Sequence, residues 1–147
     1  MPSESPALLD ANVLVYAFHQ DSDHHQASRT LLDRAQVGQL ALCVTPQVLA
    51  EFYAVVTDSR RVSAPREPEE AVQAIRDMIA MPGVTLLSMP AEIVIRWVDL
   101  LAKHPVKRGR IFDYQLVASM LANDITKLYT FNKGDFERFT EIQVMVP

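Results

Sequence analysis

Cysteine and glycine are scarce in this sequence, and each shortage excludes or disfavours a class of site. Cys43 is the one cysteine among 147 residues, so an internal disulfide and a cysteine-based zinc site are both excluded. It lies in the apolar segment 40–44, which predicts a buried thiol, and such sparing use of cysteine suits a reducing cytoplasm. Only 4 glycines stand against 9 prolines, which disfavours a glycine-rich phosphate-binding loop.

Long apolar runs and an excess of basic residues are also missing. No run approaches the roughly 20 apolar residues that cross a membrane, and residues 1–6 lack the basic and apolar regions of a signal peptide. We therefore expect a cytoplasmic protein with no membrane partner. The formal net charge is −4, whereas nucleic-acid-binding proteins usually carry a basic excess. This argues mildly against such a partner, but it leaves room for a basic patch beside an acidic site.

The sequence does have enough apolar residues for one packed domain spanning residues 1–147. Hydrophobic residues make up 49% of the chain and charged residues 22%, as in an ordinary soluble protein. Short apolar runs, which predict buried strands, lie at 7–10, 40–44, 84–87, 127–130 and 142–146. Segments with helical spacing or helix start signals lie between them, at 12–18, 24–37, 45–59, 68–81, 90–103 and 111–122. This alternation predicts an α/β fold, namely a three-layer α/β/α sandwich with a mostly parallel central sheet of about five strands.

Three acids far apart in the sequence, Asp10, Glu51 and Asp113, are each embedded in apolar residues. Carboxylates are rarely buried without a partner, because an unpaired charge is costly to desolvate. Asp10 ends the first predicted strand, and Glu51 lies in the helix that follows the second, so both should lie beyond the carboxyl ends of the strands, where open α/β sheets place their sites. Glu51 and Asp113 have apolar neighbours three and four residues away, so we expect both side chains to face the core.

Clustered carboxylates repel one another and raise one another's pKa values. A shared Mg²⁺ or Mn²⁺ would offset this repulsion, since both ions prefer oxygen ligands. The pattern therefore predicts a metal site among Asp10, Glu51 and Asp113, with metal-assisted attack of water on a phosphate as its chemistry. Helix capping or a salt bridge to an arginine is the alternative for any one of these acids, but it does not explain why all three fit one edge of the sheet.

Basic and aromatic residues give weaker signals. Lys107, Arg108 and Arg110 precede Asp113, and they are either RNA-phosphate contacts or a solvated loop. The pair Arg60-Arg61 is interpreted as plain surface. Helical spacing favours a core position over base stacking for Tyr16, Phe18 and Trp97, and the histidines His19, His24 and His25 are interpreted as solvated surface.

Four segments, in order along nearly the whole chain, resemble the motifs of the PIN-domain ribonucleases and, within them, the VapC toxins of bacterial VapBC toxin–antitoxin pairs. They are residues 9–14 with Asp10, 45–52 with Glu51, 111–118 with Asp113, and 128–136 with Thr130. The resemblance implies a compact α/β/α domain with Mg²⁺- or Mn²⁺-dependent endoribonuclease activity on RNA. It also implies a homodimer and a cognate VapB-like antitoxin.

The closing motif departs from the pattern of many relatives. These carry an acid two residues after the motif threonine, Thr130, where this chain has Asn132. Asp135 is the nearest acid, so either Asn132 or Asp135 is the residue that faces the metal. Thr45 and Thr130 place hydroxyls at strand ends, where either could orient a ligand or a water.

Three other functions compete with this interpretation. A haloacid-dehalogenase-like phosphatase also starts with an Asp at a strand end, but it needs a second Asp where this chain has Asn12. A receiver-like phospho-accepting signalling domain needs an acceptor Asp after a middle strand, and residues 43–45 and 86–88 supply none. A catalytically silent RNA-binding or scaffold protein is disfavoured by the intact set of acids, and only an activity assay decides against it.

Overall fold

The computed structural model describes residues 5–108 and 110–147. Its centre is a sheet whose strands are β1 (Ala7–Leu9), β2 (Leu42–Val44), β3 (Val84–Leu86), β4 (Lys127–Tyr129) and β5 (Gln143–Met145). The strand order is β3-β2-β1-β4-β5, and every neighbouring pair is parallel. The predicted α/β fold is therefore confirmed, with a sheet that is fully rather than mostly parallel.

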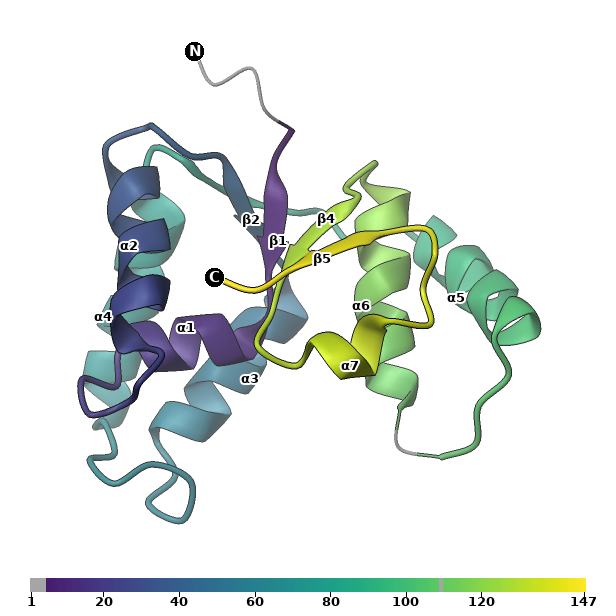
Figure 1. Cartoon of the computed structure of the whole chain (residues 1–147). Helices are drawn as coiled ribbons and strands as arrows, with labels where there is room; N and C mark the ends of the chain where they lie inside the picture. Colours follow the sequence, from purple (N-terminus) through teal and green to yellow (C-terminus); the bar gives the residue numbers. More distant parts are fainter. Residues whose placement is uncertain (1–4, 109) are drawn as a thin grey trace.

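Helices cover both faces of the sheet, as Figure 1 shows. They are α1 (Ala11–Ala17), α2 (His25–Gln36), α3 (Pro46–Val56), α4 (Pro68–Ala80), α5 (Glu92–Lys103), α6 (Ile111–Ala122) and α7 (Lys133–Phe136). Helices α1 to α4 lie on one side and α5 and α6 on the other, which gives the three layers predicted. None of the helices in the described part of the chain is long and apolar enough to cross a membrane.

The central strand β1 is buried along its whole length, between β2 on one side and β4 on the other. Leu8 and Leu9 are fully buried, and Leu8 is in register with Cys43 of β2 and Leu128 of β4. Continuous apolar strands of this kind are typical of parallel sheets covered on both faces. Cys43 is buried, as predicted, and burial raises the pKa of its thiol to about 12, so the thiol is unreactive at neutral pH.

Helix α3 begins where the sequence predicts and ends earlier. The Thr45 hydroxyl accepts a hydrogen bond from the Val48 backbone N–H at 3.1 Å, and Pro46 occupies the first turn. The sequence favoured a helix to Ser59, but α3 ends at Val56. The Val56 carbonyl instead accepts a hydrogen bond from the Arg66 backbone N–H at 2.7 Å, which turns the chain back towards the fold.

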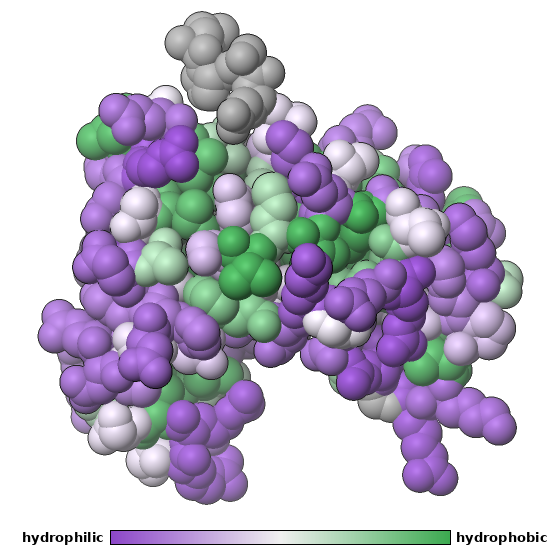
Figure 2. All heavy atoms as spheres, viewed as in Figure 1, coloured by the Kyte–Doolittle hydropathy of each residue, from purple (hydrophilic) through white to green (hydrophobic). Residues whose placement is uncertain are grey.

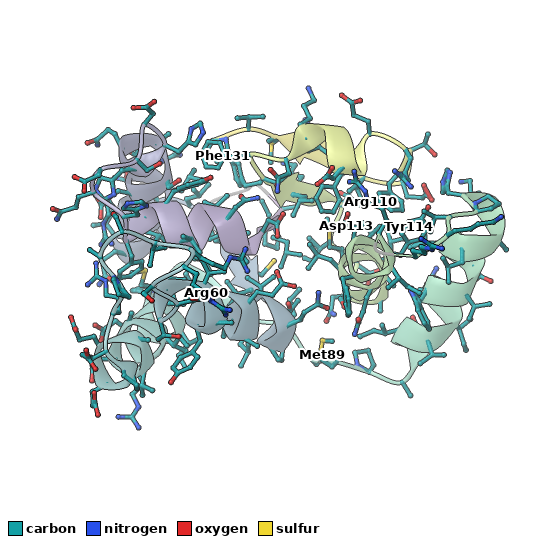
Figure 3. All side chains as sticks on the ribbon, turned by 90° about the horizontal axis from the view of Figure 1, so that it is seen from below. Arg60, Met89, Arg110, Asp113, Tyr114 and Phe131 are labelled. Atoms are coloured by element: carbon teal, nitrogen blue, oxygen red, sulfur yellow. The ribbon has the colours of Figure 1, made fainter. Side chains whose placement is uncertain are left out.

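Both helices that leave the first two strands start at the same edge of the sheet. Helix α1 begins directly after β1, and α3 begins directly after β2 and packs against α1. Figure 3 looks onto this carboxyl-end edge, with α1, α3, α6 and α7 arranged around its centre. The residues predicted to form the site are therefore delivered from four elements to one end of the molecule.

Candidate active site

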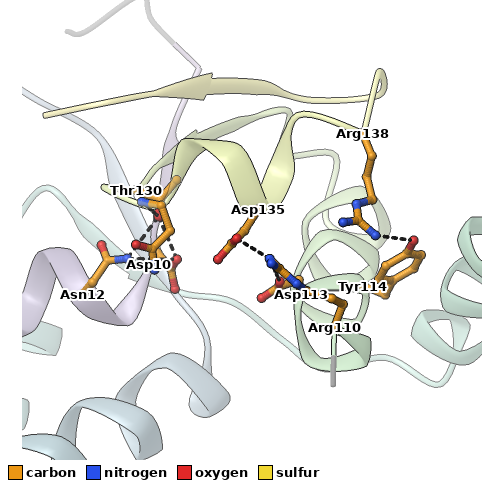
Figure 4. A network of polar contacts seen from close by, with 9 residues as sticks. Asp10, Asn12, Arg110, Asp113, Tyr114, Thr130, Asp135 and Arg138 are labelled. Carbon is orange, nitrogen blue, oxygen red and sulfur yellow. Dashed lines mark hydrogen bonds and ion pairs between the residues drawn. The ribbon is translucent and has the colours of Figure 1, made fainter. Parts of the chain in front are cut away.

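Asp10 caps helix α1 and is held by three hydrogen-bonding groups. Its Oδ1 accepts from the Ala11 backbone N–H at 2.8 Å, and its Oδ2 accepts from the Thr130 hydroxyl at 2.9 Å. The Asn12 side-chain amide donates to the Thr130 hydroxyl at 3.1 Å and makes a longer contact of 3.4 Å with Asp10 Oδ2. Figure 4 shows this network joining the start of α1 to the end of β4. The carboxylate is thereby fixed in one orientation, as a metal ligand requires.

The loop after β4 is tied to the same network. The Phe131 backbone N–H donates to Asn12 Oδ1 at 3.3 Å, and the Asn132 backbone N–H donates to the Thr130 hydroxyl at 3.0 Å. The hydroxyl of Thr130 is thus used to orient Asp10. Sequence reasoning did not identify Asn12 as part of the site, although its place two residues after Asp10, in the first turn of a helix, was the available signal.

Asp113 lies in the first turn of α6, with 29% of its side chain exposed. Arg110 Nη1 lies 3.9 Å from Asp113 Oδ2 and also forms an ion pair with Asp135, so this arginine bridges two acids (Figure 4). Burial raises the pKa of Asp113 to about 6, and the charges of Asp135 and Asp10 add to the rise. Asp113 is therefore a carboxylate that a cation would stabilise.

The pKa of Asp10 is raised as well. Burial is the largest cause, the hydrogen bonds from Thr130 and Ala11 oppose it, and the charges of Glu51 and Asp135 add to it. Asp135 thus acts on both Asp10 and Asp113 from α7, a helix that the sequence did not predict. The acids share one electrostatic environment, as expected of a cation site.

Glu51 corrects one prediction. We expected it to face the core, but it is exposed, and its carboxylate accepts a hydrogen bond from Gln47 Nε2 at 3.1 Å. The buried side of α3 is instead formed by Val48, Leu49, Phe52 and Val56. Glu51 lies beside this stripe, on the side that faces the pocket described next.

One pocket of about 550 Å³, here called the acidic pocket, brings the three predicted acids together. Its lining includes Asp10, Asn12, Tyr16, His19, Glu51, Arg61, Asp113 and Asn132. Figure 2 shows that this end of the molecule is hollowed between the half built from α1 to α4 and the half that contains α5 and α6. The convergence predicted from the sequence is therefore present, but as an open pocket rather than a buried cluster.

The acidic pocket offers a hard cation the oxygen ligands that it prefers. Within residues 5–108 and 110–147, no group of three or more His, Cys, Asp or Glu side chains is arranged to hold an ion on its own. Mg²⁺ commonly keeps several waters and uses only one or two protein carboxylates, and a pocket of this volume has room for them. Two half-buried carboxylates with raised pKa values fit such an ion.

The remaining predicted site residues differ in whether they line the acidic pocket. Lys107 and Arg108 are exposed and absent from the lining of the acidic pocket, whereas Arg110 is engaged by Asp113 and Asp135. The Thr45 hydroxyl is buried and serves as the cap of α3, away from the pocket lining. Asn132 lines the pocket through the loop after β4.

Comparison with known proteins shows the family of this chain. Residues 7–142 match the family model of the PIN domain. The chain belongs to the PIN-domain family. This PIN domain is 32% identical over 135 residues to Ribonuclease VapC43 of Mycobacterium tuberculosis, an alignment that covers 92% of this chain and 90% of that protein. The resemblance inferred from the four sequence motifs is confirmed.

Solved structures share the fold. The VapBC2 structure from Rickettsia felis, bound to a DNA fragment from its promoter, has a TM-score of 0.69 at 18% identity and covers 97% of this chain and 98% of its own. A toxin–antitoxin complex from Klebsiella pneumoniae has a TM-score of 0.61 at 18% identity, with 96% and 97% covered. At these identities the likeness establishes the architecture of this PIN domain and nothing finer.

Proposed function

We propose that this PIN domain is a metal-dependent endoribonuclease and the toxin of a toxin–antitoxin pair. The observation that carries the proposal is the convergence of Asp10, Glu51 and Asp113 on one open pocket, with the pKa values of both aspartates raised. The curated relative VapC43 is named a ribonuclease. Acids arranged in this way suit hydrolysis of a phosphodiester better than a purely structural role.

Asp10 and Asp113 are the proposed metal ligands, and Glu51 completes the ligand shell or positions the attacking water. Mg²⁺ or Mn²⁺, when bound, would activate that water and offset the charge developing on the phosphate. Thr130 keeps the Asp10 carboxylate in place through its 2.9 Å hydrogen bond. Asn132 lines the pocket and Asp135 is not among its lining residues. For the fourth acidic position we nevertheless favour Asp135, because Arg110 joins it to Asp113 and its charge acts on both aspartates.

The negative pocket repels RNA unless basic residues offset its field. Lys107 and Arg108 are exposed next to α6 and are proposed to steer the RNA backbone towards it. Arg110 is engaged by two acids, so it would have to leave Asp113 or Asp135 before binding a phosphate. Its first role in this proposal is to hold those two carboxylates together.

The proposal predicts cleavage of RNA by the purified chain that stops in EDTA and returns with Mg²⁺ or Mn²⁺. Because water rather than the RNA 2′-hydroxyl attacks, the products should carry no 2′,3′-cyclic phosphate. End-labelling and mass spectrometry of a cleaved oligonucleotide measure both points. Cleavage that persists in EDTA and leaves cyclic phosphate ends would contradict the mechanism.

A homodimer and an antitoxin partner are the second part of the proposal. Helix α5 exposes three neighbouring apolar side chains, Val94, Ile95 and Val98, at 59%, 64% and 53%, and exposed apolar patches commonly mark interfaces. We expect light scattering to give a dimer at micromolar concentration, and Ile95→Glu with Val98→Glu to give a monomer. If a small gene lies immediately upstream, co-expression with its product should protect cells and yield a complex. A monomeric wild type would contradict the dimer.

A further inference from the structure

We infer that the groove between α1 and α3 is a nucleotide subsite for single-stranded RNA, in which Arg61 binds the phosphate next to the cleaved one and Tyr16 stacks on the base. The inference rests on the proposed ribonuclease function and assigns two residues that contact its RNA substrate. It also revises two interpretations made from the sequence, in which Arg61 was plain surface and Tyr16 a core residue.

The lining of the acidic pocket has two chemically different parts. Asp10, Glu51 and Asp113 form one part, and the charges of Asp10 and Glu51 act on Asp113. The lining then follows α1, through Asn12 and Tyr16 one helical turn apart, and reaches Arg61 in the connection after α3. A volume of about 550 Å³ lies within the usual range of small-ligand sites. The groove is therefore large enough for a nucleotide whose neighbouring phosphate lies at the acids.

Arg61 is the one lysine or arginine among the described residues that line this pocket. Its neighbour Arg60 is neutralised, because its Nε lies 3.0 Å from Asp58 Oδ1 and its Nη2 donates to Asp58 Oδ2 at 3.1 Å. For Arg61, no ion pair is found within residues 5–108 and 110–147. A polyanion that approaches three carboxylates requires a compensating cation, and Arg61 supplies one that lines the pocket and is in no ion pair with the described residues.

The backbone that carries Arg61 is fixed in place. The Arg61 backbone N–H donates to the Asp58 carbonyl at 3.0 Å, and the Val62 N–H donates to the same carbonyl at 3.1 Å. The Arg66 guanidinium then donates to the Phe18 carbonyl at 2.8 Å, which ties this connection to the end of α1. Arg61 is thus presented by an anchored turn, and its guanidinium is suited to bidentate binding of a phosphate.

Tyr16 is held in an aromatic cluster at the lining of the acidic pocket. Its ring lies 5.0 Å from that of His24 and 5.3 Å from that of Phe131, measured between centroids, and it is half-buried where it lines the pocket. Phe131 belongs to the loop that Asn12 anchors, so the aromatic cluster and the Asp10 network are one unit. Figure 3 shows Phe131 between the α1–α2 side and α7. Aromatic rings in such grooves stack on bases that are not paired, which favours single-stranded RNA.

The first test compares two adjacent arginines. Arg61→Ala should raise KM for a single-stranded oligonucleotide about 10-fold with little change in kcat, since a charged hydrogen-bonded contact is removed. Affinity is measured by fluorescence anisotropy at several salt concentrations, with Asp10→Asn present to prevent cleavage. The negative slope of log affinity against log salt should become shallower by about 0.7 when Arg61→Ala is added. Arg60→Ala is the matched control and should leave both values at wild type, and Arg61→Lys should restore most of the slope.

The second test locates the phosphate and the base. On an oligonucleotide that the wild type cleaves at one bond, single phosphates are replaced by neutral methylphosphonates. One replacement beside the cleaved bond should raise KM about 10-fold in the wild type and have no further effect in Arg61→Ala. Tyr16→Leu should also weaken binding about 10-fold, whereas Tyr16→Phe should not, and a duplex of the same sequence should be a poor substrate.

The outcomes separate the subsite from the proposed function. If the wild type cleaves no RNA, the ribonuclease proposal fails. If it cleaves RNA while Arg61→Ala and Arg60→Ala have equal KM and salt slope, the proposed function stands and the subsite is refuted. A loss confined to antitoxin binding in Arg61→Ala would likewise overturn the subsite, since the groove would then hold a protein.

Discussion

Asp10→Asn should lower the rate of RNA cleavage by at least ~10²-fold, the scale on which losing one charge-stabilising group acts. Asparagine has nearly the size of aspartate, and its carbonyl oxygen can still accept a hydrogen bond from Thr130 or Ala11. The fold should therefore be retained while the negative charge that binds the cation is lost. Cleavage kinetics with circular dichroism as a check of folding measure this effect.

The matched control is Asp124→Asn. Asp124 is exposed after α6 and has a positive φ of 57°, a conformation that asparagine tolerates well. This variant makes the same chemical change outside the pocket and should cleave RNA at the wild-type rate. RNA binding by Asp10→Asn should largely survive, because phosphate contacts and catalytic acids are different groups. Undiminished Mn²⁺ binding in calorimetry of the Asp10→Asn, Asp113→Asn double variant would refute the metal assignment.

The parts of the molecule that could be predicted are those with a local signal. The buried strand β1 is a continuous apolar run. The start of α3 is marked by Thr45 as its N-cap and by Pro46 in its first turn, and both signals depend only on residues close in sequence. Helix α7 escaped prediction because four residues are too short for any periodicity. Its position nevertheless brings Asp135 to the acids, a consequence of tertiary packing.

The orientation of Glu51 and the role of Arg61 needed the tertiary structure. Apolar neighbours surround Glu51 in sequence, but the buried side of α3 passes through Phe52 and Val56 and leaves Glu51 exposed. Arg61 is indistinguishable from Arg60 in sequence. The difference arises from the turn at Asp58, which pairs with one arginine and leaves the other at the pocket. The spacing of residues along the chain therefore predicts neither the exposure of Glu51 nor the difference between Arg60 and Arg61.

Asp113→Asn should make the protein more stable at pH 7 in EDTA. The pKa of Asp113 rises from 3.8 to about 6 through burial first and the charge of Asp135 next. The folded state therefore binds a proton more tightly than the unfolded state, so this group contributes stability at low pH that is lost as pH rises from about 4 to about 6. Above pH 6 the ionised carboxylate destabilises the fold, by about 1 kcal/mol once its partial exposure to solvent is allowed for.

A change of pH and the addition of Mn²⁺ both test whether the stability difference arises from the Asp113 carboxylate. In EDTA, the stability advantage of Asp113→Asn should be present at pH 7 and shrink towards pH 5, where the wild-type carboxyl is mostly protonated. In Mn²⁺ at 100 times its Kd, the wild type should gain about 2.7 kcal/mol, and the variant, which lacks a ligand, should gain much less. The variant is therefore the more stable protein in EDTA, and the wild type is the more stable protein in Mn²⁺.

Urea unfolding measures the free energy of unfolding of each protein under four conditions, at pH 5 and pH 7 with either EDTA or Mn²⁺. Asp124→Asn, with no change in the pocket, should follow the wild type throughout. A variant less stable than wild type at pH 7 in EDTA would show that Asp113 contributes to folding through its own contacts. In that case the repulsion among the acids would not be the feature that metal binding relieves. The inversion of the stability order on adding Mn²⁺ is the expected result because the charges that weaken the fold are the same ones that bind the cation.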